Sequence, residues 1–422
     1  MNTQTPKHIS HLQCLICGDK YQPNEAEYVC PKHGYEGILE VVYDYDYIAL
    51  QTHPDKWLQN RDTSIWRYKA LLPIADDSRL PLLHIGGTPL YNASRLAKNM
   101  GLSKVWIKDE GRQATASLKD RAAAIALVKA QEQNAEVITA ASTGNAAAAL
   151  SGLCAGVGQK NVIFVPESAP AAKIAQLLVC GSEVMLVKGT YDDAFELCLQ
   201  ATEKYGWYNR NTGYNPYMTE GKKTVSYEIF EQLGRKAPDV VFVSVGDGCI
   251  IGGVYKGFKD LHELGWIEKM PRLIGVQAEG SNYLYEAWKN GEDLQQKPPI
   301  AAHTIADSIS AGLPRDRFKA MRAVTDSKGI FMTVTDNEIL QAIPSLAAQT
   351  GVFAEPAGAT AYAGLVKAVA EKWVDVSEEI VVLNTGNGLK DIIGAQKSLE
   401  LCGKKANLIE AKMEALQNMI GK

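Results

Sequence analysis

Short apolar runs rich in β-branched residues recur along the chain, and each leads through a turn into an alanine- or glycine-containing segment with helical periodicity. The predicted strands are 137–139, 161–165, 240–245 and 380–383, and the helices predicted after them are 142–153, 171–179, 253–264 and 389–399. Alternating strands and helices are typical of parallel sheets covered by helices on both faces. We therefore predict an α/β fold in which ligands bind where strands end and helices begin.

The length of 422 residues exceeds what one hydrophobic core usually organises, so we predict two lobes with appended segments. The expected parts are a segment 1–45, a large domain 46–135 plus 215–400, a small domain 136–214 and a C-terminal helical tail 401–422. In the tail, one apolar stripe at helical spacing is formed by Ile409, Met413, Leu416 and Ile420. We expect this stripe to pack on the chain's own core or on a sister subunit.

The composition, with 46% hydrophobic and 22% charged residues, is that of an ordinary globular protein. A net charge of −4 gives no electrostatic reason to bind nucleic acid or an anionic membrane, so neither partner is expected. No run approaches the roughly 18 apolar residues needed to span a bilayer, and the polar start lacks a secretory signal. Eight cysteines in a chain of this length do not suggest a disulfide scaffold, and a cytoplasmic location is expected.

Four potential metal ligands stand close together near the start of the chain, namely Cys14, Cys17, Cys30 and His33. The two pairs are separated by twelve residues, which suits a zinc ribbon with tetrahedral ligation by three cysteines and one histidine. Four protein ligands leave no open position on the metal. We therefore predict structural zinc, with a ribbon that lacks metal as the alternative.

A lysine lies at the predicted start of a helix. Ser117 and Asp120 have the spacing of a capping box, with Ser117 as the N-cap, just before an alanine-rich helical run. Lys119 would then lie in the first turn, where the helix dipole favours its neutral, nucleophilic form. A lysine that bonds to an aldehyde needs that bias. The alternative is a solvated surface lysine.

Two further turns carry groups suited to anionic ligands. At 141–146, Ser142, Thr143 and the backbone N–H groups of a helix start would bind a carboxylate, and Asn145 could donate to a phenolic oxygen. At 246–253, glycines would let backbone N–H groups surround a phosphate. Asp247 is expected to point away from that phosphate or to accept backbone N–H bonds. Simple helix caps and tight turns are the alternatives.

A fourth turn, at 384–391, follows an apolar strand and contains Thr385. The hydroxyl of Thr385 could meet a ring nitrogen at the strand end. Compared with a carboxylate partner, a hydroxyl leaves a pyridine nitrogen mostly unprotonated and favours elimination and replacement over transamination.

Together these motifs resemble the fold-type II pyridoxal phosphate-dependent enzymes, and within that family most closely the threonine synthase branch with its paralogues. The similar motifs are GGTPL at 86–90, IKDEG at 107–111, SLKDR at 117–121, ASTGN at 141–145, EGKKT at 220–224, AEPAGA at 354–359 and TGNGLKD at 385–391. The similarity extends from residue 12 to about residue 399. It implies a two-lobe fold like that of the tryptophan synthase β chain, with an added N-terminal ribbon.

The resemblance also implies roles for single residues. Lys119 would bond covalently to pyridoxal phosphate and later move protons, with Glu355 near the cofactor. The other residues implied to bind the cofactor are Asn145, Gly246, Asp247, Gly248, Cys249, Ile250 and Thr385. The residues implied to bind an amino-acid substrate are Ser142 and Thr143 at its carboxylate and Lys173 at its phosphate.

The chain departs from the family pattern in three places. Leu118 replaces the usual aromatic residue before the lysine, and Asp247 replaces the usual asparagine of the phosphate loop. Met218 and Thr219 stand where threonine synthases tend to carry an arginine that grips the substrate phosphate. Residues that could compensate are Arg210, Lys222, Arg315 and Arg317.

We therefore predict a homodimeric lyase of the threonine synthase type, which converts O-phospho-L-homoserine and water to L-threonine and phosphate. One alternative is a paralogous β-replacement enzyme acting on phosphoserine, like cysteate synthase. Another is an ammonia-lyase acting on serine, threonine or diaminopropionate. The least favoured alternative is a non-catalytic binding protein of the same fold.

Overall fold

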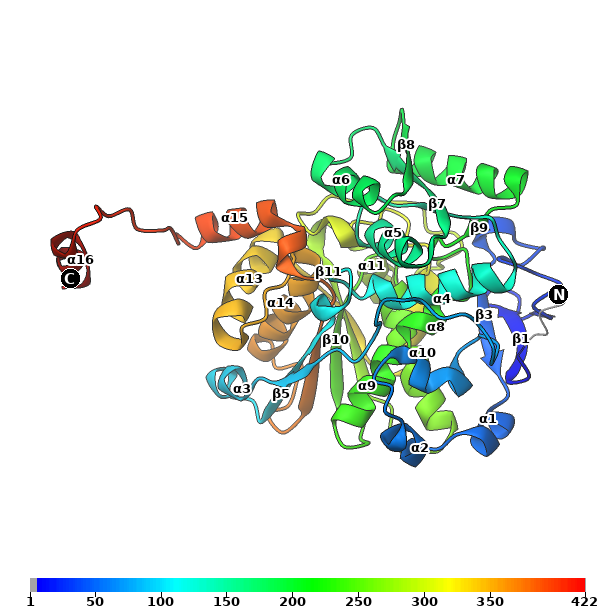
Figure 1. The fold of residues 1–422 in the computed structure, drawn as a ribbon. Helices are drawn as coiled ribbons and strands as arrows, with labels where there is room; N and C mark the ends of the chain where they lie inside the picture. The colour runs from blue at the N-terminus through cyan, green and yellow to red at the C-terminus, as the bar shows by residue number, and fades with distance from the viewer. Residues whose placement is uncertain (1–5, 422) are drawn as a thin grey trace.

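The computed structural model describes residues 6–421. Their N-terminal part forms a three-stranded antiparallel sheet in the order β2-β1-β3. The strands are β1 (Ile9–Cys14), β2 (Lys20–Tyr21) and β3 (Leu39–Tyr43). Two short helices, α1 (Tyr45–Gln51) and α2 (Pro54–Gln59), connect this ribbon to the remainder of the chain (Figure 1).

A six-stranded sheet in the order β12-β11-β10-β13-β5-β4 organises the larger lobe. All neighbouring strands are parallel except β4, which runs antiparallel to β5. The strands are β4 (Leu90–Asn92), β5 (Lys104–Asp109), β10 (Val240–Ser244), β11 (Arg272–Ala278), β12 (Ile330–Val334) and β13 (Glu379–Asn384). Every residue of β10 is buried, as expected for a parallel strand covered on both sides.

Helices cover both faces of this sheet. Because side chains alternate along a strand, Val240 and Phe242 pack into one core and Val241 and Val243 into the other. The first core includes α3 (Ser94–Met100), α13 (Asp336–Thr350) and α14 (Pro356–Ala370). The second includes α4 (Lys119–Glu132), α8 (Met218–Lys222), α9 (Thr224–Gln232), α10 (Cys249–Glu263), α11 (Tyr283–Asn290) and α12 (Arg317–Asp326).

The smaller sheet has four parallel strands in the order β8-β7-β6-β9. They are β6 (Val137–Ala141), β7 (Lys160–Pro166), β8 (Glu183–Val187) and β9 (Tyr208–Asn209), with α5 (Asn145–Val157), α6 (Ala171–Val179) and α7 (Tyr191–Tyr205) between them. The predicted α/β fold with parallel sheets is confirmed. The exact domain limits stay a prediction.

Three helices begin at other residues than the sequence predicted. α5 begins at Asn145 rather than 142, because Gly144 occupies the N-cap position. α10 begins at Cys249 rather than 253, so Gly253 lies inside the helix, where a Cβ atom would approach the Cβ atom of Lys222 to 2.7 Å. α15 (Ile392–Leu401) begins after Asp391, whose side chain accepts the N–H of Gly394 at 2.8 Å.

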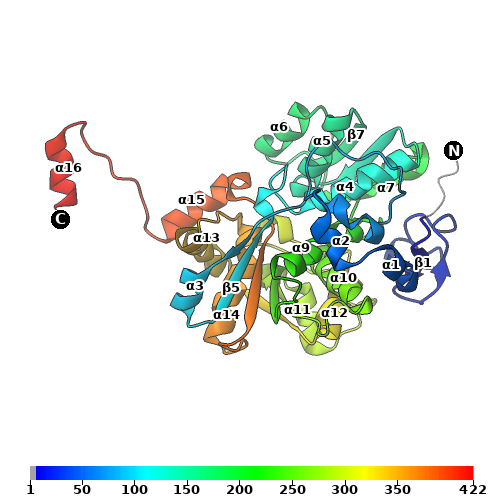
Figure 2. The same cartoon turned by 60° about the horizontal axis from the view of Figure 1, so that its bottom comes forward.

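The C-terminal arm leaves the larger lobe after α15 and ends in α16 (Met413–Ile420), which stands away from the body in both views (Figures 1 and 2). No residue of α16 is buried, and Ile409 precedes the helix. Packing of the apolar stripe on the chain's own core is therefore not observed, and packing on a sister subunit stays a prediction. Within residues 6–421, no helix is both long and apolar enough to cross a membrane.

Candidate active site

The carboxyl ends of three neighbouring strands lead into the predicted cofactor residues. The strands β5, β13 and β10 lie side by side in the large sheet, and they precede Lys119, Thr385 and Gly246 along the chain. The N–H of Leu118 donates to the carbonyl oxygen of Thr385 at 3.0 Å. Lys119 and Thr385 therefore lie on hydrogen-bonded segments, although most of the chain separates them in sequence.

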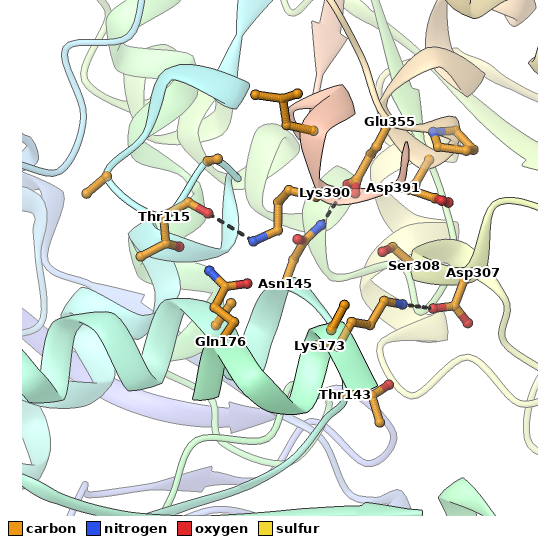
Figure 3. A pocket seen from close by; sticks show the side chains of 18 residues that line it. Thr115, Thr143, Asn145, Lys173, Gln176, Asp307, Ser308, Glu355, Lys390 and Asp391 are labelled. Atoms are coloured by element: carbon orange, nitrogen blue, oxygen red, sulfur yellow. Dashed lines mark hydrogen bonds and ion pairs between the residues drawn. The ribbon is translucent and has the colours of Figure 1, made fainter. Parts of the chain in front are cut away.

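A cavity of about 910 Å³ opens at these strand ends. Among its lining residues are Lys119, Ser142, Thr143, Asn145, Lys173, Gly246, Asp247, Gly248, Cys249 and Ile250. A second cavity of about 370 Å³ shares part of this lining and extends to Glu355 and Lys390 (Figure 3). The structure thus places Lys119, the predicted phosphate-binding loop and the predicted carboxylate-binding turn around the same cavity.

The capping box predicted before Lys119 is wrong. α4 begins at Lys119 itself, and Leu118 precedes it with helical backbone angles and no side-chain cap. The carboxylate of Asp120 instead accepts the N–H of Thr115 at 2.6 Å and the hydroxyl of the same residue. The Ser117 hydroxyl is fully buried without a hydrogen-bond partner among the described residues. Because the Asp120 side chain is hydrogen-bonded to the upstream turn, it forms no capping box, and Ser117 does not cap a helix.

The start of α4 is held by a buried ion cluster. Arg121 makes two hydrogen bonds of 2.7 Å to the carboxylate of Glu110 and two more of 2.7 Å to that of Glu228. Burial alone would lower the pKa of Arg121, but the two carboxylates raise it above its usual value. Planar guanidinium groups match carboxylates in this paired geometry. The cluster fixes the first turn of α4, and with it the position of Lys119.

The glycine loop after β10 has the geometry of an anion site. Gly248 adopts a φ of +91°, and a Cβ atom there would come within 2.6 Å of the Cβ atom of Ala320. α10 begins directly afterwards without a side-chain cap, so its first N–H groups have no intrahelical partner. As expected, Asp247 accepts a backbone N–H, that of Arg315 at 3.2 Å. The loop fits a phosphate group.

Asn145 and Glu355 meet at the boundary of the two lobes. The Asn145 amide donates to the Glu355 carboxyl at 2.6 Å (Figure 3). Burial raises the pKa of Glu355 to about 7, while Asn145 and the nearby lysines act in the opposite direction. Glu355 therefore changes its protonation state near neutral pH beside a residue predicted to touch the cofactor.

The cations around the cavity differ in their hydrogen-bond and ion-pair partners. Met218 is fully buried, and the Thr219 hydroxyl accepts from Lys319 at 3.0 Å, so this part of α8 offers no cation to the cavity. Lys173 pairs with Asp307 at 2.5 Å. Arg315 lines the cavity and pairs with Asp192 at 3.5 Å.

The other residues that could replace the missing arginine differ in whether they reach the cavity. Arg317 donates to Glu36 of the ribbon and to the carbonyl oxygen of Leu294, so it faces away from the cavity. Arg210 lines the cavity. Lys222 is fully buried, and its Nζ lies 3.5 Å from the hydroxyl of Thr212.

Several lining residues were not singled out from the sequence, among them Lys390, Tyr191 and Asp307. Lys390 lines both cavities and donates to the carbonyl oxygen of Thr115 at 3.1 Å. It belongs to the TGNGLKD motif, so attention to charge within that motif would have found it. Tyr191 and Asp307 also line the large cavity, but no local motif marks them.

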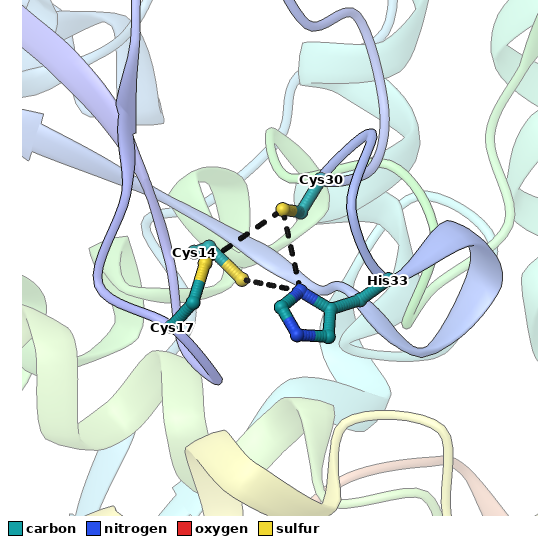
Figure 4. Close-up of side chains that lie close together, drawn as sticks. All are labelled: Cys14, Cys17, Cys30 and His33. Carbon is teal, nitrogen blue, oxygen red and sulfur yellow. Dashed lines mark hydrogen bonds between the residues drawn. The ribbon is translucent and has the colours of Figure 1, made fainter.

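The four predicted metal ligands lie close together in the ribbon (Figure 4). Their ligand atoms, those of Cys14, Cys17, Cys30 and His33, all lie within 4.8 Å of one another. The Sγ atom of Cys30 lies 3.9 Å from that of Cys17 and 3.5 Å from Nδ1 of His33. Three thiols and one imidazole at this separation suit a tetrahedral zinc ion.

The ribbon contacts both lobes. Glu36 pairs with Arg317, and Glu40 pairs with Arg322. On the side of the smaller sheet, the hydroxyl oxygen of Tyr28 accepts the N–H of Asn209 at 3.1 Å. The ribbon is thereby bonded to the end of β9, directly before Arg210.

Residues 81–386 match the model of the pyridoxal-phosphate dependent enzyme family. The chain belongs to this family. It is 38% identical to the threonine synthase of Methanocaldococcus jannaschii over 410 residues, which cover 97% of this chain and 98% of that protein. It is 36% identical to the threonine synthase of Methanosarcina acetivorans over 412 residues, covering 97% and 98%. The chain is therefore a threonine synthase-like, pyridoxal phosphate-dependent enzyme, as the sequence motifs implied.

Solved structures support the same architecture. The processed form of threonine deaminase isoform 2 from Solanum lycopersicum superposes with a TM-score of 0.65 at 24% identity, covering 85% of this enzyme and 89% of that chain. The L-serine ammonia-lyase from Rhizomucor miehei superposes with a TM-score of 0.64 at 21% identity, covering 74% and 97%. These similarities confirm the two-lobe fold.

Proposed function

We propose that the enzyme holds pyridoxal phosphate on Lys119 and converts O-phospho-L-homoserine and water to L-threonine and phosphate. The observation that carries the proposal is the meeting of Lys119, the glycine loop at 246–250 and Asn145 around one cavity. It is supported by 38% identity to a threonine synthase across 97% of the chain.

The residues that would hold the cofactor come from three loops. The free N–H groups at the start of α10 would bind its phosphate, and Thr385 would bond its ring nitrogen. Asn145 would bond its phenolic oxygen with the amide hydrogen that is not given to Glu355. When bound, the cofactor withdraws electrons from the substrate α-carbon and makes its proton more acidic.

The protein's own groups would then bind the substrate and move protons. Ser142, Thr143 and the N–H groups before α5 would hold the substrate carboxylate. The Nζ atom of Lys119, once free, would take the proton from the α-carbon and return protons later in the reaction. Lys173 would leave Asp307 to contact the substrate phosphate.

We further propose that the cluster Cys14, Cys17, Cys30 and His33 holds structural zinc, since all four ligand positions come from the protein. We also propose a homodimer located in the cytoplasm, with the domain limits predicted from the sequence.

The test is a substrate panel on the purified enzyme loaded with pyridoxal phosphate. We expect threonine and inorganic phosphate to form from phosphohomoserine in equal amounts. Phosphoserine, serine, threonine and diaminopropionate serve as matched controls, with ammonia and keto-acid readouts. Ammonia and keto acid from an unphosphorylated amino acid, without turnover of phosphohomoserine, would refute the proposal.

The second candidate is a paralogous replacement enzyme or ammonia-lyase. The observation that favours it is that Met218 and Thr219, both buried and uncharged, stand where an arginine was expected. The same substrate panel separates the two candidates.

A further inference from the structure

Arg210 is a buried cation without a counterion. It directly follows β9, is only 2% exposed and lines the large cavity. Its Nε and Nη2 atoms are buried and have no hydrogen-bond partner, and no carboxylate of residues 6–421 lies within ion-pair distance of it. Burial lowers the pKa of Arg210 to about 10. A guanidinium stays charged at neutral pH, so this group can bind an anion without first losing another partner.

A second buried cation, Lys222, lies near Arg210. Lys222 is fully buried, and its pKa is lowered first by burial and further by the charges of Lys119 and Arg210, while Cys249 and Asp316 act in the opposite direction. By contrast, two other cations of the cavity wall already have acidic partners, Lys173 with Asp307 and Arg315 with Asp192 (Figure 3 shows the first pair). Arg210 and Lys222 form no ion pair within residues 6–421, so an anion there would meet two unpaired cations, which favours a doubly charged ligand.

The backbone places Arg210 beside the proposed substrate site. Its N–H donates to the carbonyl oxygen of Thr139 in β6 at 3.0 Å. The next residue, Asn211, accepts the N–H of Ala141 at 2.9 Å, just before Ser142. Cys249 of the glycine loop also acts on Arg210, so Arg210 lies between the proposed substrate site and that loop, but the loop supplies its own N–H donors to the cofactor phosphate. The ligand of Arg210 is thus expected on the substrate.

We propose that Arg210 binds the side-chain phosphate of the substrate and so determines specificity for a phosphorylated amino acid. The inference rests on the proposed function, and it selects one residue among the cations that could replace the arginine missing at Met218 and Thr219. Three donors of a guanidinium that is already desolvated would gain charge-assisted hydrogen bonds when the dianion binds.

The test compares the loaded wild-type enzyme with Arg210→Met. We expect KM for phosphohomoserine and the inhibition constant of inorganic phosphate both to rise by about 10- to 100-fold, which corresponds to the loss of one charge-assisted hydrogen bond. The visible absorption of the bound cofactor and its affinity should stay unchanged. Arg95→Met, an exposed arginine on α3, is the matched control and should change neither constant.

Thermal unfolding separates ligand binding from a structural role. Removing an unpaired buried charge should raise the Tm of the loaded Arg210→Met enzyme without phosphate, whereas a structural arginine would lower it. Inorganic phosphate should raise the Tm of the wild type but not of Arg210→Met. Arg210→Lys, which keeps the charge, should retain part of that increase.

The outcomes distinguish the inference from the proposed function. Loss of the cofactor from Arg210→Met would assign the residue to the cofactor phosphate and overturn the inference. An unchanged phosphate inhibition constant would also overturn it. If the wild type does not convert phosphohomoserine, the proposed function fails, and the phosphate-dependent rise in Tm still decides whether Arg210 binds a phosphate dianion.

Discussion

The side-chain amide of Asn145 donates a hydrogen bond of 2.6 Å to the buried carboxyl of Glu355. Asn145 is the first residue of α5, beside the small sheet, and Glu355 is the N-cap of α14, beside the large sheet. The bond therefore joins the two lobes across the cavity. Because one partner titrates near neutral pH, the junction is sensitive to pH.

Glu355 should make the cofactor-free enzyme less stable as pH rises. Its pKa is about 7 in the folded chain against 4.5 for an ordinary glutamate. A raised pKa means that the stabilising protonated form is fully present below pH 4.5 and is lost as pH rises toward 7. The free energy of unfolding of the wild type should fall by up to about 3 kcal/mol relative to Glu355→Gln across this interval. Urea unfolding at several pH values measures the difference.

Other buried carboxyls titrate in the same range, so the comparison with Glu355→Gln is what isolates this group. Asp120, for example, has a pKa raised by burial to about 6. Parallel stability curves for the wild type and Glu355→Gln would contradict the prediction.

Lys119→Ala should abolish covalent binding of the cofactor. The variant is expected to lose the visible absorption of the lysine-bound cofactor and at least about 100-fold in turnover, because the covalent anchor and the proton carrier disappear together. Absorption spectra and threonine formation measure the two losses. Lys98→Ala, in the last turn of α3 and remote from the cavity, is the control and should behave as the wild type. Unchanged absorption and turnover in Lys119→Ala would refute the assignment.

Arg121→Met should destabilise the fold strongly. The change leaves the buried carboxylates of Glu110 and Glu228 without their shared guanidinium. Removing one partner of a buried ion cluster in this way should lower the free energy of unfolding by about 3–5 kcal/mol. Lys104→Met breaks a half-exposed contact with Glu379 and should cost less than about 1 kcal/mol. Urea unfolding compares the two variants, and equal losses would argue against the anchoring role of Arg121.

The ribbon should hold one zinc ion per chain. Cys30→Ser is expected to remove the metal and lower the Tm, because the metal orders the ribbon, whose Glu36 pairs with Arg317 of the larger lobe. Elemental analysis and thermal unfolding measure the two effects. Cys402→Ser, which changes an exposed free cysteine outside the cluster, should have neither effect. A metal-free wild type with an unchanged Tm after chelation would contradict the prediction.

The sequence was informative where structure follows from local patterns. The strands β6, β7, β10 and β13 were predicted close to their observed limits, and the rule that ligands bind at strand ends placed Lys119 with the glycine loop. The glycines at 246–253 were interpreted as a loop around a phosphate, and the structure gives the reason for one of them, since Gly248 has a positive φ and lies close to Ala320.

The sequence could not predict which side chains contact one another in the folded protein. Asp120 bonds to Thr115 instead of supporting a cap at Ser117, because the upstream turn folds back onto it. Likewise, nothing in the spacing of Arg210, Arg315 and Arg317 distinguishes the one that remains unpaired. That difference depends on acidic residues brought in from remote segments.

The last strand in the chain, β13, lies in the middle of the large sheet, between β10 and β5. During synthesis, the edges of β10 and β5 that face β13 therefore stay unpaired until residues 379–384 have left the ribosome. Pairing over such long sequence distances is slow, so the nascent chain passes through an aggregation-prone interval. Cofactor binding is thereby expected only after β13 has been made, since a fragment that ends before residue 379 lacks the strand that joins β10 to β5.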